Sequence, residues 1–280
     1  MHFPKHWRTA RQGEVTAWGW SDEGPAQAEA HAASRLTRIM DWLRRGKKES
    51  AQRYGYPDRP MREEVLREFR ETDGSLAAAV TRNSYGCLVL NTASLMFVDV
   101  DSPESKESSF LAGIFGFRRP DKSREPDAFE KEVSGRVQQW LASRPDWGWR
   151  VYRTCAGIRL LATHQAFAPG DSWCQQAFEA FQADPLYRKL CAAQKCFRAR
   201  LTPKPWRCDA DKPHVRWPWG NEKQEARFRQ WEARYLAAAK AYATCRLIGH
   251  FGHQEIAGPF RELVEIHDST TQAESSLPLA

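Results

Sequence analysis

The chain has 280 residues and a formal net charge of +7, from 42 Lys and Arg against 35 Asp and Glu. This length suits one large domain or two small ones, and the positive balance favours an anionic partner such as nucleic acid. The seven cysteines include no CxxC spacing, and the N-terminus has no apolar segment, which argues against a disulfide scaffold or a secreted protein. No apolar run approaches the roughly 20 residues of a membrane-spanning helix. We therefore expect a cytoplasmic protein with no membrane partner.

The first 75 residues are predicted to form an N-terminal helical region packed on a core domain. Residues 14–20 alternate as a short strand, and an apolar stripe at helical spacing predicts a helix from Ser21-Asp-Glu-Gly-Pro25 to about Arg45. Residues 49–60 are typical of a loop, and a short helix is expected from Arg62 to about Arg70.

The pattern changes at residue 76, where strand-like segments begin. Apolar runs at residues 76–81, 87–90 and 95–100, separated by turn sequences, predict an antiparallel meander. Residues 102–126 are rich in charge, Pro and Gly and predict a mobile excursion. A helix at about 127–142 and a hairpin of strands at 149–154 and 158–163 follow.

The remaining pattern is mixed. It predicts helices at 171–182 and 184–195, a strand at 197–201, a Pro, Trp and basic loop at 203–220, a long amphipathic helix at 221–243, a strand at 244–248 and a last helix at 259–267. The core domain is thus expected over 76–268, followed by a disordered tail at 269–280. The fold class is predicted as α+β, with a mostly antiparallel central sheet flanked by N-terminal and C-terminal helices.

Two acidic side chains stand out at the end of the apolar run Leu95-Met-Phe-Val-Asp-Val-Asp101. Strand side chains alternate faces, so Asp99 and Asp101 point the same way, close enough to share one cation or hold two. A carboxylate pair that loses hydration needs cations or strong donors nearby. The pair therefore indicates a site for Mg²⁺ or Mn²⁺, unless Asp101 only begins a turn and Asp99 only accepts backbone hydrogen bonds.

A basic stretch, Phe197-Arg-Ala-Arg-Leu-Thr-Pro-Lys-Pro-Trp-Arg207, provides candidate phosphate ligands. Its cations are Arg198 and Arg200 on one strand face, then Lys204 and Arg207 from a Pro-stiffened loop. Guanidinium groups offer a planar fork to phosphate oxygens, and Arg153 in the 149–163 hairpin is a further candidate. If that hairpin neighbours the acidic strand, acids and bases line one cleft for a cation and phosphates. Alternatively, the arginines pair with the two aspartates in a structural ion network that binds no metal.

Together, Phe97-Val-Asp-Val-Asp101 and the later Arg153-Thr-Cys-Ala-Gly-Ile-Arg-Leu-Leu-Ala162 resemble the archaeo-eukaryotic primase and primase-polymerase superfamily. In that family an apolar strand ends in two acids that bind divalent metal, and a hairpin carries a Gly and a His that contacts the triphosphate. The resemblance implies a core related to the RNA-recognition fold.

This chain departs from the family pattern in two places. It has Arg159 where the histidine is expected, so the resemblance assigns Arg159 and the nearby His164 as catalytic candidates beside the acids. A third acidic motif has no clear counterpart; Asp209 and Asp211 come nearest. A divergent and inactive member of the family would show the same departures.

These observations predict a primase-polymerase-like nucleotidyltransferase or a nucleotide-binding protein whose partners are a nucleoside triphosphate, single-stranded nucleic acid or both. Two alternatives stay open. One is a non-catalytic module on the same fold that binds nucleic acid or protein. The other is a metal-dependent nuclease that uses His164 as a base or ligand. A zinc site formed by Cys191, Cys196, Cys208 and His214 has less support, because these residues lack the spacings usual for zinc ligands.

Overall fold

The chain forms two compact units, Met1–Glu63 and Glu64–Ala280, in a computed structural model that describes residues 1–45, 60–103 and 127–280. The predicted loop at 49–60 and excursion at 102–126 fall almost wholly outside the described residues. The division between the units lies earlier in the sequence than the predicted boundary at residue 75. No helix in the described ranges has both the length and the apolar character needed to cross a membrane.

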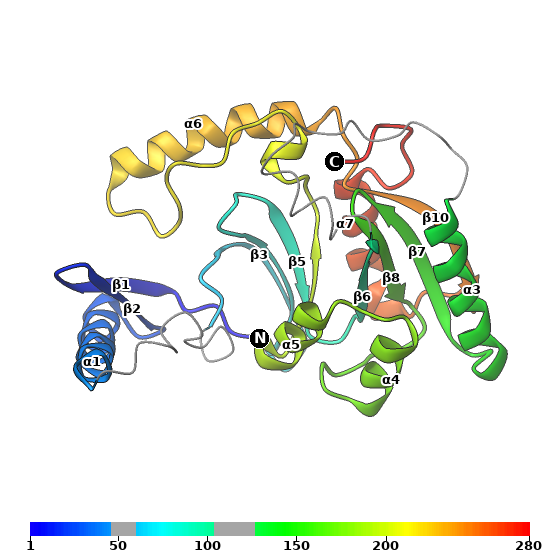
Figure 1. The fold of residues 1–280 in the computed structure, drawn as a ribbon, viewed down its shortest axis with the longest axis horizontal. Coiled ribbons are helices and arrows are strands. Elements are labelled where there is room, and N and C mark those ends of the chain that lie inside the picture. Colours follow the sequence, from blue (N-terminus) through cyan, green and yellow to red (C-terminus); the bar gives the residue numbers. More distant parts are fainter. Residues whose placement is uncertain (46–59, 104–126) are drawn as a thin grey trace. The chain divides into compact units, whose positions relative to one another are not determined.

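The first unit is a two-stranded antiparallel hairpin packed on one helix (Figure 1). Strand β1 (His6–Gln12) pairs with β2 (Val15–Ser21), and α1 (Pro25–Arg44) lies against them. Gly19 permits this packing, because a Cβ there would lie 2.1 Å from the backbone nitrogen of Ala32. The predicted strand and helix are confirmed, whereas β1 was not predicted.

The second unit contains two four-stranded antiparallel sheets with the strand orders β3-β4-β5-β9 and β10-β7-β8-β6. The first sheet consists of β3 (Glu64–Arg70), β4 (Leu76–Arg82), β5 (Leu88–Thr92) and β9 (Phe197–Arg200). The second consists of β6 (Phe97–Asp101), β7 (Gly148–Thr154), β8 (Gly157–Ala162) and β10 (Cys245–Gly252). The edge strands β6 and β9 contact each other, so the two sheets meet there.

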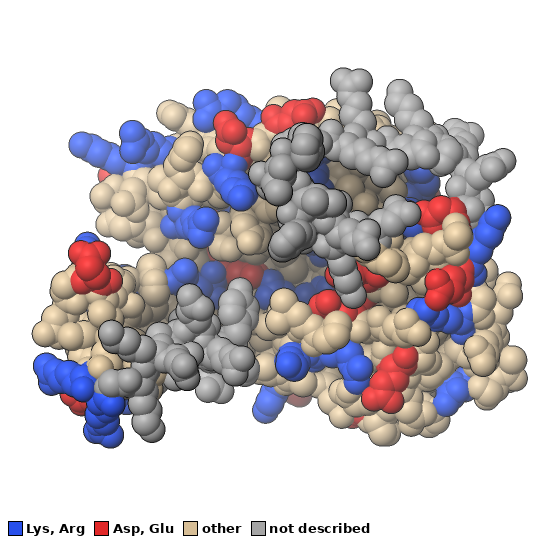
Figure 2. All heavy atoms as spheres, in the orientation of Figure 1, with Lys and Arg blue, Asp and Glu red and all other residues tan. Residues whose placement is uncertain are grey.

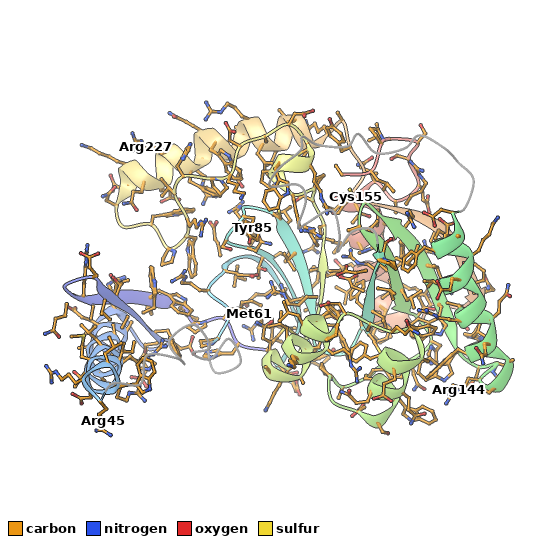
Figure 3. The ribbon with its side chains drawn as sticks, in the orientation of Figure 1. Arg45, Met61, Tyr85, Arg144, Cys155 and Arg227 are labelled. Atoms are coloured by element: carbon orange, nitrogen blue, oxygen red, sulfur yellow. The ribbon has the colours of Figure 1, made fainter. Side chains whose placement is uncertain are left out.

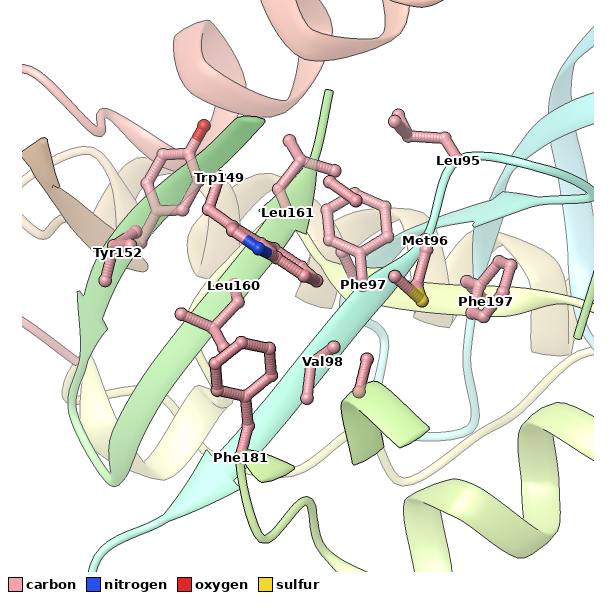
Figure 4. Packing of buried hydrophobic residues seen from close by; sticks show 14 of the residues in the cluster. Leu95, Met96, Phe97, Val98, Trp149, Tyr152, Leu160, Leu161, Phe181 and Phe197 are labelled. Carbon is pink, nitrogen blue, oxygen red and sulfur yellow. The ribbon is translucent and has the colours of Figure 1, made fainter. Parts of the chain in front are cut away.

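Helices cover both faces of the sheet that contains β6. They are α3 (Ala128–Ser143), α4 (Ser172–Ala180), α5 (Pro185–Gln194) and α7 (Arg261–Thr271). Helix α6 (Glu222–Ala239) lies instead against the other sheet, where its Glu232 pairs with Arg82 of β4. Single 3-10 turns are η2 (Pro205–Arg207) and η3 (Gly258–Phe260). On one face, the ring of His267 in α7 packs 4.8 Å from the ring of Tyr152. On the other, the Trp149 ring packs 5.0 Å from Phe181, at the end of α4. Apolar side chains of β6, β7 and β8 fill the space between this sheet and the helices (Figure 4).

The strand β6, the helix α3 and the strand β7 form a crossover. Both strands are antiparallel to β8, which lies between them, so β6 and β7 run parallel to each other. This arrangement is a split β-α-β unit. The fourth strand, β10, pairs with β7 at the edge opposite β6. An α+β fold with antiparallel sheets is therefore confirmed.

Three sequence predictions for individual elements are wrong. Residues 64–70 form the edge strand β3 and not a helix, because pairing with β4 outweighs the helix propensity of its Glu and Arg residues. The acidic strand β6 does not continue a meander with β5; it crosses to the other sheet and pairs with β8. The final residues are ordered, since α7 extends to Thr271 and the backbone of Ala243 exchanges hydrogen bonds with residues 278 and 280.

Candidate functional site

The acidic pair lies at the end of edge strand β6, directly opposite β8. Asp99 is the register partner of Arg159, and Asp101 is the register partner of Gly157. The close approach requires glycine, because a Cβ on Gly157 would lie 2.0 Å from the carbonyl oxygen of Val100. Residues two apart on a strand share a face, so both carboxylates leave the same side of the sheet, as predicted.

The Arg159 side chain is buried behind this pair, with 3% of its surface exposed. Its Nε donates to Asp99 Oδ1 at 2.9 Å, and its Nη1 donates to the carbonyl oxygen of Arg200 at 3.0 Å. Burial alone would lower the pKa of the Arg159 guanidinium, but the adjacent Asp99 carboxylate raises it above its usual value. Arg159 is therefore always charged, and it ties β8 to both β6 and β9.

A buried histidine lies on the other side of Arg159. His267 Nε2 is 3.4 Å from Arg159 Nη1, and His267 Nδ1 is 2.8 Å from Asp268 Oδ1. Asp268 also accepts a hydrogen bond of 2.7 Å from the Tyr152 hydroxyl and pairs with Arg150. Burial lowers the pKa of His267. A neutral ring with its proton on Nδ1 satisfies both neighbours, because it donates to Asp268 and accepts from Arg159.

His267 and Asp268 are not among the site residues predicted from the sequence. They lie in a helix more than a hundred residues beyond the acidic strand, and the only local signal was the apolar stripe of that helix. Their place beside Arg159 depends on which sheet face α7 covers.

Three basic side chains lie close to the acidic pair. Arg200 comes from β9, whereas Lys204 and Arg207 come from the Pro-rich segment that follows. Arg200 and Arg207 line a cavity of about 50 Å³ together with Asp99, Asp101, Arg159 and Cys155, the last at the β7–β8 turn labelled in Figure 3. The segment is held in place by the Tyr235 hydroxyl of α6, which donates to the carbonyl oxygen of Pro203 at 2.6 Å.

These three cations have no carboxylate partner among the described residues, unlike several other arginines of the unit. Arg82, Arg150 and Arg229 each form ion pairs with acidic side chains. In contrast, no ion pair joins Arg200, Lys204 or Arg207 to a carboxylate in the described part of the chain. Over the visible face of the second unit, by comparison, acidic and basic side chains are interspersed (Figure 2).

Burial and the neighbouring positive charges lower the pKa values of both Lys204 and Arg200. Burial lowers the pKa of Lys204 to about 8, and the neighbouring charges of Arg200 and Arg207 act in the same direction. Burial also lowers the pKa of Arg200. The side chains that line the cavity include three guanidinium groups and two carboxylates. Lys204, close by, adds a further positive charge. An anionic ligand would relieve this excess of positive charge.

No family model, no curated protein and no solved structure matches this chain. The geometry of the pocket is therefore the basis for any assignment of function.

Three of the predicted site residues lie elsewhere. Arg153 points to the opposite face of the sheet from Arg159 and pairs with Asp127 at 2.5 Å, because its register partner is Ile158. Arg198 lies nearer α5, where its Nη1 donates to Gln194 at 3.2 Å. His164 follows β8 and packs 4.5 Å from the Trp147 ring, with Nδ1 accepting from the backbone of Gly148.

The predicted metal ligands meet only part of what a resident divalent ion requires. Within the described ranges, no group of three or more His, Cys, Asp or Glu side chains is placed to hold a metal ion, which applies to the considered zinc set as well. One oxygen of Asp99 is already held by Arg159, and the surrounding side chains carry an excess of positive charge. As it stands, the pocket fits a phosphate group better than a bare cation.

Proposed function

We propose that this chain binds a nucleoside triphosphate by its phosphate groups in the pocket between β6 and β9. The observation that carries the proposal is that Arg200 and Arg207 line one cavity, with Lys204 close to both, and that none of the three has a described carboxylate partner. A cavity of about 50 Å³ has room for one phosphate group, so the rest of the nucleotide would lie outside, toward Lys204.

The proposal includes a relationship to the primase-polymerase superfamily. Its support is the acidic strand, the adjacent hairpin and their observed pairing, with Asp99 opposite Arg159. The split β-α-β unit is the part that this sheet would share with an RNA-recognition-like core. The position of β10 beside β7, and not beside β6, would make the present sheet a variant of that core.

Binding of inorganic triphosphate and of each nucleoside triphosphate, measured by calorimetry and thermal shift, tests the proposal. Removing one charged donor from a phosphate costs roughly 1.5–3 kcal/mol, which corresponds to about 10-fold to 100-fold weaker binding for Arg200→Gln. Arg198→Gln is the matched control, because Arg198 lies on the same strand face but outside the cavity lining. Equal affinity in wild type and Arg200→Gln, or no binding at all, would refute the proposal.

A second candidate is nucleotidyl transfer, in which Asp99 and Asp101 hold Mg²⁺ or Mn²⁺ together with the bound triphosphate. One observation favours it: Asp99 has 32% of its side chain exposed, and only its Oδ1 is engaged by Arg159. Mg²⁺ is commonly bound by one or two carboxylates plus substrate phosphates, so the phosphates would complete the ligand set. The ion would neutralise charge on the phosphate oxygens during transfer.

Incorporation of a labelled nucleotide into a primer–template, with Mn²⁺ present, tests this second candidate. We expect Asp101→Asn to abolish incorporation while leaving triphosphate binding within about 3-fold, because phosphate contacts come from the basic side chains. If triphosphate binds and no incorporation occurs under any template condition, the non-catalytic binding module becomes the better description. The nuclease alternative has less support, because His164 lies in an aromatic cluster and does not line the pocket.

A further inference from the structure

Two aromatic side chains form a corner next to the pocket. Tyr85 lies at the turn between β4 and β5, labelled in Figure 3, and 41% of its surface is exposed. Trp206 lies in η2 and is partly exposed. Their ring centroids are 5.3 Å apart, with an angle of 82° between the ring planes. The two rings therefore present a face and an edge at right angles. We call this pair the aromatic corner.

The aromatic corner is flanked by ammonium groups. Lys204 Nζ lies 5.6 Å and Lys212 Nζ 4.8 Å from the centroid of the Trp206 ring. Lys212 is exposed, and no described carboxylate forms an ion pair with either lysine. Cations over an indole ring are attracted to it, but each also keeps the capacity to bind an anion.

Lys204 connects the aromatic corner to the pocket. Lys204 lies over the Trp206 ring, and it is also close enough to Arg200, Arg207 and Asp101 for their charges to act on its pKa. The cations Arg200, Lys204, Arg207 and Lys212 thus form a basic track that leads from the cavity to the aromatic corner.

We propose that the aromatic corner and this track bind single-stranded nucleic acid, with one base stacked at Trp206 and Tyr85 and the backbone phosphates on the lysines and Arg207. Proteins that bind single strands without sequence preference combine a basic track with aromatic rings on which bases stack. An acidic peptide would use the cations but would leave the rings of Tyr85 and Trp206 without a planar partner. The inference extends the proposed function, because it places a polymer beside the triphosphate pocket.

Fluorescence anisotropy of the 280-residue chain with a labelled oligothymidylate of roughly 10 nucleotides tests this inference. We expect Trp206→Ala to weaken binding by about 10-fold, and Trp206→Phe to retain most of the affinity, because a base stacks on either ring. We also expect a slope of about −2 for log K against log salt concentration, from roughly three phosphate contacts, and Lys212→Glu should lower its magnitude by about 0.7 or more.

Two matched controls separate the aromatic corner from general surface effects. Trp173, with 44% of its surface exposed, lies on α4, and Lys189 is exposed on α5. Trp173→Ala and Lys189→Glu should bind the oligonucleotide like wild type. Because Lys212 is a surface side chain, Lys212→Glu remains informative even if Trp206→Ala fails to fold.

The outcomes distinguish this inference from the proposed function. If the oligonucleotide does not bind, or if Trp206→Ala and Lys212→Glu bind it as tightly as wild type, the inference is overturned even when triphosphate binding depends on Arg200. If triphosphate does not bind but oligonucleotide binding depends on Trp206 and Lys212, the proposed function fails and the inference stands.

Discussion

The ion pair between Asp99 and Arg159 decides whether the acidic strand is free to bind a metal ion, and its removal gives the sharpest prediction. Asp99→Ala leaves a guanidinium that is 3% exposed without its only described carboxylate partner. Breaking a buried pair from one side costs about 3–5 kcal/mol. Because 32% of the Asp99 side chain is exposed, water offsets part of this loss, and we expect about 2–3 kcal/mol.

A double-mutant cycle isolates the pair itself. Arg159→Met removes the buried charge and fills similar volume, so the double variant Asp99→Ala/Arg159→Met should be more stable than the sum of the two single changes, by about 1–2 kcal/mol. For a unit of this size, each kcal/mol shifts the melting temperature by about 2–4 °C, so Asp99→Ala should melt about 4–12 °C lower. Scanning calorimetry on the full chain measures this shift.

The same variants report on metal binding. Arg159→Met releases Asp99 Oδ1 and removes a positive charge next to the site, so Mn²⁺ affinity in the presence of triphosphate, measured by electron paramagnetic resonance, should rise by at least about 10-fold. A coupling energy below about 0.5 kcal/mol would show that the pair contributes nothing beyond surface electrostatics. Unchanged Mn²⁺ affinity in Arg159→Met would contradict the competition between Arg159 and a metal ion for Asp99.

Three further predictions concern groups around the pocket. Since the pKa of Lys204 is lowered to about 8, its proton is lost as the pH rises through that value; triphosphate affinity should fall between about pH 7 and 9, and less so in Lys204→Arg, as calorimetry at each pH would show. Cys155 lines the pocket and is the exposed one of the seven cysteines, so saturating triphosphate should slow its alkylation by maleimide; an unchanged rate under saturation would place the ligand elsewhere. Burial lowers the pKa of His267 below 6.5, so below that pH the unfolded chain binds a proton that the folded chain does not. The free energy of unfolding should therefore fall on acidification, and His267→Gln should reduce that slope, measured by urea denaturation, by up to about 1.4 kcal/mol per pH unit.

Local sequence pattern was sufficient for most helices and for the face of the sheet on which the acids lie. The alternation in Phe97-Val-Asp-Val-Asp101 fixed the common direction of Asp99 and Asp101, because side-chain direction in a strand depends only on parity. The hairpin at 149–163 and the apolar stripe of α6 were likewise correct. Each of these features is determined by neighbours in sequence.

Long-range pairing explains what the sequence did not reveal. The turn after β5 is compatible with a third meander strand, and nothing local shows that β6 crosses to the other sheet. For the same reason, Arg159 was expected to contact phosphate, whereas its partners are Asp99, the backbone of Arg200 and His267. The alternative in which an arginine pairs with the acids is correct for Arg159 and Asp99, but it does not extend to Arg200 and Arg207.

The excess of positive charge sets an order of binding for any reaction at this site. A divalent cation alone would enter a pocket where Arg159, Arg200 and Arg207 outnumber the two carboxylates, and its affinity should be weak. A triphosphate carries enough negative charge to reverse the sign of the pocket, after which Asp99 Oδ2, Asp101 and the phosphate oxygens together suit a cation. Mn²⁺ should therefore bind measurably only when triphosphate is present, and each should strengthen the binding of the other by the same factor. If Mn²⁺ bound equally well without triphosphate, the phosphate groups would not be the ligands that complete the site, and the charge excess would not control it.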